Sequence, residues 1–136
     1  MLVQPVGHLV LALTDSKLSG IIRDAFLQEL YKVSVVTDGE ATIRFLTENP
    51  GTELLLIDSD LPGLNGYETV QFLRASGHSQ LIILLMAWFS LQSLATSNLV
   101  GCDEFIAKPV DVANLIITAS QQLLNRQAIS NFHKNL

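Results

Sequence analysis

Five short apolar runs alternate with longer amphipathic segments, and this pattern limits the folds that the chain can adopt. The runs comprise residues 9–13, 33–36, 54–57, 81–86 and 105–107. Apart from Ser34 the runs are continuous in apolar residues, which is typical of strands that are buried on both faces. The segments between them show helical spacing, with Ile21 and Ile22 on the apolar face of the first. The alternation predicts five strand–helix units that form a doubly wound α/β fold, a parallel sheet covered by helices on both faces.

Composition and charge exclude several classes of protein. Of the 136 residues 49% are apolar and 15% charged, so we expect one domain with a substantial core. This domain is expected over residues 1–126, with residues 127–136 extending the last helix or beginning a linker. A net charge of −5 has the wrong sign for direct contact with nucleic acid. No apolar run reaches the ~20 residues of a membrane span, and no secretory leader follows Met1, which together predict a cytoplasmic protein without membrane contact.

Charged residues follow three of the predicted strands. Asp15 comes after the first strand, Asp58 after the third and Lys108 after the fifth. In a parallel sheet the carboxyl ends of the strands share one edge, so we expect the three side chains to converge there. Taken singly, each residue is more often a helix cap or part of a surface ion pair. Together, two carboxylates and an ammonium group favour a site for a hard cation such as Mg²⁺ and for a phosphoryl group.

Three segments resemble the receiver domain of response regulators, the module that accepts a phosphoryl group on an aspartate. The first holds Asp58, with proline four residues later and glycine eight residues later. The others are Asp-Gly-Glu at 38–40 and the segment 101–109, which ends in Lys-Pro. The resemblance covers about residues 8–126 and implies a flavodoxin-like (βα)5 sheet with the strand order 2-1-3-4-5. It also implies that a histidine kinase or a histidine phosphotransfer protein donates the phosphoryl group.

The resemblance further implies a role for each of seven residues around the site. They are Asp58 as phosphoacceptor and metal ligand, Asp15 as metal ligand, Asp60 as a metal ligand through its backbone carbonyl, Lys108 as the phosphoryl-contacting lysine, Pro109 as the cis proline that follows it, Ala87 as the small residue beside the site and Phe105 at the aromatic switch position.

Two residues depart from the family pattern. Thr14 replaces an acid that holds the metal through water, so Thr14 is an outer-sphere ligand at most and Mg²⁺ binding weakens by roughly 1–3 kcal/mol. Met86 replaces a Thr or Ser whose hydroxyl binds the phosphoryl group, and a thioether donates no hydrogen bond. Two interpretations remain open. The chain is either a working receiver with weak Mg²⁺ affinity and altered switching, or a degenerate receiver that serves as a protein docking module.

Other functions are also compatible with single motifs. Asp58-Ser-Asp60 after an apolar strand matches a phosphatase of the haloacid-dehalogenase type, with the first acid as nucleophile and the second as general acid. The proline and glycine that follow at fixed spacing argue against this enzyme and for a signalling protein that catalyses only its own phosphorylation. Cys102 has the pattern of a small buried residue instead of a nucleophile. The uncharged segment 91–100 predicts a fourth helix, and we expect a homodimer through this helix, the fifth strand and the fifth helix.

Overall fold

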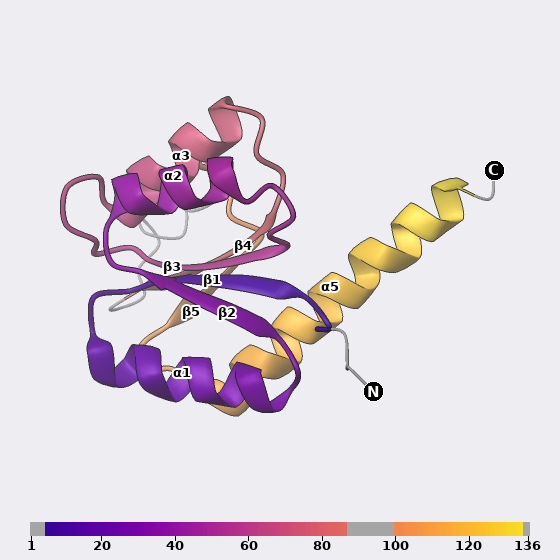
Figure 1. Cartoon of the computed structure of the whole chain (residues 1–136), viewed down its shortest axis with the longest axis horizontal. Coiled ribbons are helices and arrows are strands. Elements are labelled where there is room, and N and C mark those ends of the chain that lie inside the picture. The colour runs from indigo at the N-terminus through magenta and orange to yellow at the C-terminus, as the bar shows by residue number, and fades with distance from the viewer. Residues whose placement is uncertain (1–4, 87–99, 135–136) are drawn as a thin grey trace.

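A five-stranded parallel sheet forms the centre of the protein (Figure 1). The computed structural model describes residues 5–86 and 100–134. The strands are β1 (His8–Ala12), β2 (Lys32–Val36), β3 (Leu54–Asp58), β4 (Leu81–Met86) and β5 (Glu104–Ala107). They lie in the order β2-β1-β3-β4-β5, which confirms the predicted fold class and strand order. Each predicted strand is present, with its bounds shifted by no more than one residue.

Helices cover both faces of this sheet. They are α1 (Ser16–Gln28), α2 (Gly39–Glu48), α3 (Gly66–Ala75) and α5 (Val112–Lys134). In Figure 1, α1 and α5 lie on one side of the strands, and α2 and α3 lie on the other. The predicted fourth helix lies almost wholly within residues 87–99, outside the described residues. Of the candidate residues for the phosphoryl site, Ala87 lies outside the described residues and the others lie within them.

Two apolar clusters, one on each face, result from the alternation of side chains along the strands. Leu9 and Leu11 point toward Phe26 of α1, whereas Val10 and Ala12 of the same strand point toward α2 and α3. All residues of β3 and β4 are buried, as their continuous apolar sequences predict. The edge strand β2 consists of exposed and half-buried residues. The core therefore lies deepest under β3 and β4, whose ends carry Asp58 and Met86.

The turns after three strands end in residues that cap helices. Asp15 Oδ1 accepts a hydrogen bond from the backbone of Leu18 at 3.0 Å, and Asp38 Oδ1 caps α2 at 2.7 Å. Asn65 and Glu68 form a reciprocal capping box at the start of α3. Each cap satisfies backbone N–H groups that the first helical turn leaves unpaired. The caps fix where each helix leaves the sheet, and thereby fix the loops that surround the site.

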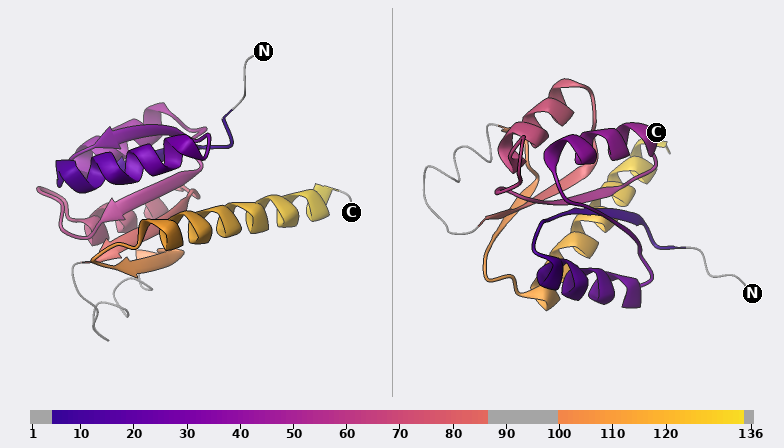
Figure 2. Two further views of the ribbon diagram at one scale, coloured as in Figure 1. Left: turned by 90° about the horizontal axis from the view of Figure 1, so that it is seen from below. Right: turned by 60° about the vertical axis from the view of Figure 1, so that its left-hand side comes forward.

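α5 continues far beyond the sheet. It runs without a break from Val112 to Lys134, so residues 127–134 extend the last helix, one of the two alternatives for this segment. Figures 1 and 2 show its C-terminal half projecting past the ends of the strands. Arg126 still contacts the body of the protein, because its guanidinium donates to the backbone oxygen of Ser79 at 2.7 Å. None of the helices in the described ranges is long and apolar enough to cross a membrane.

Arg74 connects α3 to the starts of β4 and β5. Its guanidinium donates to the backbone oxygens of Gly101, His78 and Gln80 at 2.8–3.0 Å. The guanidinium of Arg74 donates a fourth hydrogen bond of 2.9 Å to Asp103 Oδ2. This oxygen also accepts a hydrogen bond from the backbone N–H of Ile82. These backbone oxygens lie in connecting segments and need a donor that the sheet does not supply. The half-buried Arg74 side chain thus holds together the segments that lead into β4 and β5.

Arg74→Gln is expected to lower the free energy of unfolding by about 2–4 kcal/mol, because several partly buried acceptors lose a charged donor. Chemical denaturation followed by circular dichroism measures this change. Arg44→Gln is the matched control, since Arg44 is exposed on α2 and its loss should change the stability by less than about 0.5 kcal/mol. Equal effects of the two substitutions would contradict the connecting role of Arg74.

Candidate functional site

Asp58 and Lys108 form an ion pair across the carboxyl edge of the sheet. Asp58 ends β3 and is only 3% exposed, and its Oδ2 lies 2.5 Å from Lys108 Nζ. β4 lies between β3 and β5, so the lysine side chain spans the end of β4 to reach the carboxylate. The other carboxylate oxygen, Oδ1, accepts from the backbone N–H of Asp60 at 3.0 Å. The predicted convergence of these two residues, which are 50 positions apart, is therefore present.

The backbone holds Lys108 in this position. Its N–H donates to the backbone oxygen of Met86 at 2.7 Å, which continues the pairing of β4 with β5 by one residue. The peptide bond between Lys108 and Pro109 is cis, as the resemblance implies. The Lys108 side chain is about three-quarters buried, so its ammonium group neutralises Asp58 in a partly desolvated environment. Such pairing is what allows a carboxylate to remain charged inside a protein.

Asp15 lies beside this pair and also caps α1. β1 pairs with β3 in register up to Ala12 and Ile57, so Thr14 and Asp15 follow the strand next to Asp58. Asp15 and Lys108 line the same open cavity of about 360 Å³. The cap uses Oδ1 of Asp15. A cation would contact the other oxygen, so the two roles are compatible.

The donors at this edge fit a magnesium ion. Among the described residues, no group of three or more acidic, histidine or cysteine side chains gathers as a complete metal cage. The edge instead holds the carboxylates of Asp15 and Asp58, and Asp60, whose backbone carbonyl is the third predicted ligand, follows two residues after Asp58. One or two carboxylates completed by water and phosphate oxygens is the usual environment of Mg²⁺ in proteins. Thr14 is exposed and offers a hydroxyl where a further carboxylate would add charge.

Met86 ends β4 between the two partners of the ion pair. It is 1% exposed and packs on the face of α2 and α3. The hydroxyl of Tyr67, the second residue of α3, donates to Met86 Sδ at 3.4 Å. Phe105 of β5 is half-buried and packs against the same cluster. Tyr67 follows directly on Gly66, the glycine of the family pattern, but its sequence position alone predicts no role in the site.

Gly66 allows α3 to begin against the backbone of Asp58. A Cβ atom here would overlap the backbone oxygen of Asp58 and would lie 2.7 Å from Ser59 Cα. The N–H of Gly66 donates to the backbone oxygen of Ser59 at 3.0 Å. The glycine eight residues after the aspartate is therefore explained by close packing of α3 on the end of β3.

Two other sequence-based candidates lie outside the site or outside the described residues. Burial raises the pKa of the Cys102 thiol to about 12, so almost no thiolate exists at neutral pH and the side chain is not a nucleophile. Ala87 lies outside the described residues. Of the predicted dimer surface, β5 and α5 are described but the fourth helix is not, so the homodimer stays a prediction.

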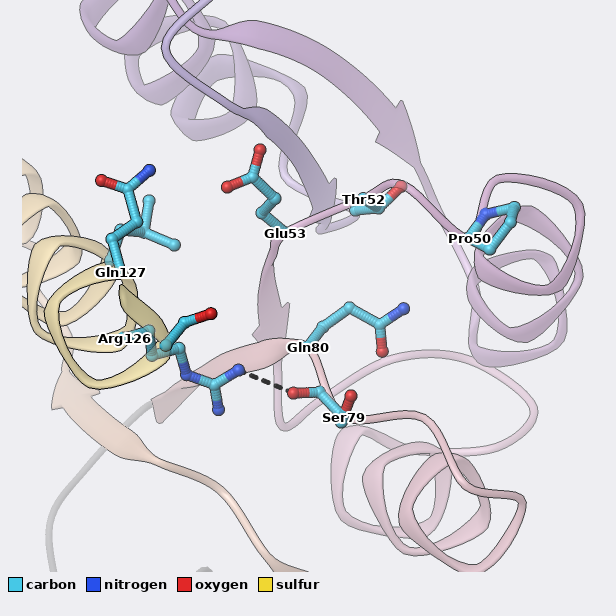
Figure 3. A pocket seen from close by; sticks show the side chains of 9 residues that line it. Pro50, Thr52, Glu53, Ser79, Gln80, Arg126 and Gln127 are labelled. Atoms are coloured by element: carbon cyan, nitrogen blue, oxygen red, sulfur yellow. Dashed lines mark hydrogen bonds between the residues drawn. The ribbon is translucent and has the colours of Figure 1, made fainter. Parts of the chain in front are cut away.

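A second cavity lies at the opposite edge of the sheet. Figure 3 shows this space of about 280 Å³ between α5 and the segments that lead into β3 and β4. Arg126 and Gln127 line it from the helix, and Thr52, Ser79 and Gln80 from the other side. Because these segments lie at the amino ends of the strands, the cavity takes no part in chemistry at Asp58.

Comparison with known proteins identifies the family. The family described as "Response regulator receiver domain" matches residues 11–120. The chain belongs to the response-regulator receiver family. It is 33% identical to response regulator RppA of Synechocystis sp. over 111 residues, 80% of this chain and 47% of that protein. It is 27% identical to the uncharacterized transcriptional regulatory protein YkoG of Bacillus subtilis, over 81% of this chain and 48% of that protein. The chain spans about half the length of these relatives.

Solved receiver structures share the fold of this receiver domain. The signal receiver domain of a putative Luxo repressor protein from Vibrio parahaemolyticus superposes with a TM-score of 0.84, covering 94% of this chain and 96% of that one at 19% identity. A CheY-like receiver from Methanospirillum hungatei gives 0.82 at 20% identity, over 90% and 97% of the two chains. No finding favours the phosphatase interpretation. Thr14 and Met86 are thus departures within a receiver domain, and not signs of another family.

Gly66→Ala should destabilise the receiver domain by about 2–4 kcal/mol or displace α3, because the added methyl group meets backbone atoms that cannot rotate away. Gly20→Ala in α1 is the control. Its Cβ would meet nothing within 4 Å, so alanine there should be neutral or stabilise by about 0.5–1 kcal/mol. Thermal unfolding of both variants measures the difference. An unchanged midpoint for Gly66→Ala would contradict the close packing of α3.

Proposed function

We propose that Asp58 accepts a phosphoryl group from a phosphohistidine of a histidine kinase or a histidine phosphotransfer protein. The observation that carries this proposal is the buried Asp58 carboxylate, paired with Lys108 at the carboxyl edge of the sheet. A buried ion pair is weak evidence for a stabilising role, because desolvation offsets most of the attraction. A buried carboxylate whose partner lysine lines an open cavity is suited to accept a group from another molecule.

The reaction requires only a nucleophile and charge neutralisation. A carboxylate oxygen of Asp58 attacks phosphorus, the bond from phosphorus to the histidine nitrogen breaks, and the nitrogen keeps that electron pair. The product is an acyl phosphate on Asp58 and an unmodified histidine on the donor. Lys108 moves its hydrogen bond from the carboxylate to a phosphoryl oxygen and thereby neutralises the charge that is transferred. The chain thus catalyses its own phosphorylation and turns over no other substrate.

Mg²⁺ would be held by the carboxylates of Asp15 and Asp58 and by the backbone carbonyl of Asp60. The cation supplies positive charge to the phosphoryl oxygens and reduces the repulsion between the carboxylates. Thr14 contributes no charge, which makes the affinity for Mg²⁺ lower than in a site with a third acid.

A groove beside the ion pair is suited to the phosphodonor protein. Asp15 and Lys108 line it together with Leu18, Ile21 and Val110. Ile21 was expected on the buried face of α1, but it is 50% exposed. An exposed apolar side chain in the groove that Lys108 also lines gives a donor protein a surface on which to dock. A kinase partner of this kind places the chain in the cytoplasm.

The degenerate interpretation is kept as a second candidate because of Thr14 and Met86. Both residues weaken interactions of the phosphoryl group, with the metal in one case and with a hydroxyl in the other. In this case the domain would act only through docking surfaces such as the groove at Ile21.

Beryllofluoride, a phosphoryl mimic, should bind in the presence of Mg²⁺ and change the fluorescence of Trp88, the single tryptophan, two residues beyond Met86. Asp58→Asn removes the nucleophile and should abolish the response. Asp24→Asn, an exposed substitution on α1, is the control and should respond like the wild type. Absence of binding in the wild type, with no labelling by a phosphodonor, would support the degenerate interpretation instead.

Thr14→Asp should raise the Mg²⁺ affinity by about 5- to 150-fold, because it restores roughly 1–3 kcal/mol of interaction with the cation. Titration with Mg²⁺ by isothermal calorimetry measures the dissociation constant. Gln121→Glu adds the same charge on an exposed part of α5 and should leave the affinity unchanged. Equal affinity of Thr14→Asp and the wild type would argue against a metal site beside residue 14.

A further inference from the structure

The hydroxyl of Tyr67 lies at the carboxyl end of β4, the strand that runs between those that lead to Asp58 and Lys108. It donates to Met86 Sδ at 3.4 Å, and Met86 is the last residue of β4. In the sheet, Leu85 is paired with Asp58 and Met86 with Ala107, the residue before Lys108. The hydroxyl therefore contacts the last side chain of the strand between Asp58 and Lys108, and that side chain is a thioether.

The backbone of Tyr67 is also held at the site. The preceding residue, Gly66, packs directly on the backbone oxygen of Asp58 and donates to the backbone oxygen of Ser59. The capping box of Asn65 and Glu68 fixes the first turn of α3 on either side of Tyr67. One end of this side chain thus starts beside Asp58, and the other end reaches Met86.

The present partner of the hydroxyl is a weak one. A thioether sulfur accepts hydrogen bonds poorly, whereas a phosphoryl oxygen is charged and forms hydrogen bonds roughly twice as strong as neutral ones. A phosphoryl group on Asp58 would present three such oxygens. Lys108 and a cation account for two of them, and the third requires a donor. The Tyr67 hydroxyl therefore gives up only a weak hydrogen bond when it changes its acceptor from sulfur to a phosphoryl oxygen.

We infer that the Tyr67 hydroxyl leaves Met86 and donates to the phosphoryl group on Asp58, so that α3 supplies the hydroxyl that β4 lacks. This inference rests on the proposed function and adds a phosphoryl-binding residue to it. It also provides a route to the surface. Tyr67, Met86 and Phe105 pack against one cluster, so movement of the Tyr67 ring changes the packing around Phe105.

Beryllofluoride affinity in saturating Mg²⁺ tests this inference in four proteins: the wild type, Tyr67→Phe, Met86→Thr and the double variant. Tyr67→Phe keeps the ring and removes only the hydroxyl, and should weaken binding by about 5- to 10-fold. Met86→Thr restores a hydroxyl at the end of β4. In that background Tyr67→Phe should have an effect of less than about 2-fold, because the two hydroxyls serve the same oxygen.

Tyr31→Phe is the matched control for loss of a phenolic hydroxyl. The hydroxyls of Tyr31 and Ser120 form a hydrogen bond of 3.2 Å on the face of α1 and α5. Tyr31→Phe should therefore bind beryllofluoride like the wild type. Thermal unfolding of each variant separates loss of binding from loss of structure. Wild-type affinity in Tyr67→Phe, or an equal loss in both backgrounds, would overturn the role of Tyr67 and leave phosphorylation of Asp58 intact. A wild type that binds no beryllofluoride would overturn both proposals.

Discussion

The ion pair between Asp58 and Lys108 exists only because β3, β4 and β5 are parallel and in register. The two residues belong to strands that are not neighbours, so the end of β4 must stop short enough for the lysine to cross it. In a parallel sheet a shift by one residue moves every side chain to the opposite face. The same register that buries the apolar runs therefore also sets the position of the charged groups.

Close approach of the helices to the strand ends is the second requirement. α3 can begin against the backbone of Asp58 because Gly66 has no side chain. The start of α1 is fixed at the same edge because Asp15 caps the first turn of this helix. The first feature brings α3 against the backbone of Asp58, and the second places Asp15 in the cavity that Lys108 also lines. The site is thus formed less by a cluster of side chains than by where the elements start and stop. This explains why a small set of polar residues suffices.

Much of this arrangement follows from the sequence. The apolar runs predict the five strands. The residues directly after the runs predict the charged groups at the carboxyl edge of the sheet, because strand ends in a parallel sheet converge. The contact between Tyr67 and Met86 could not be predicted, since it joins α3 to β4 through the direction of two side chains. The exposure of Ile21 was also missed, because helical spacing places it near Ile22 without fixing the width of the buried face. For α5, the polar sequence after residue 125 fitted both a helix and a linker, and the bond from Arg126 to Ser79 holds this part of the helix against the body of the protein.

α5 is long enough that a change of charge near its first turn has no electrostatic effect on its last turn. With 23 residues and a rise of ~1.5 Å per residue, the helix is about 35 Å long, and it starts four residues after Lys108. The Debye length at physiological ionic strength is about 8 Å, so solvent ions screen any change of charge at Asp58 well before Lys134. The electrostatic potential at the distal turns of α5 therefore does not change with the charge at Asp58. These turns can respond only to a displacement of the helix as a rigid rod.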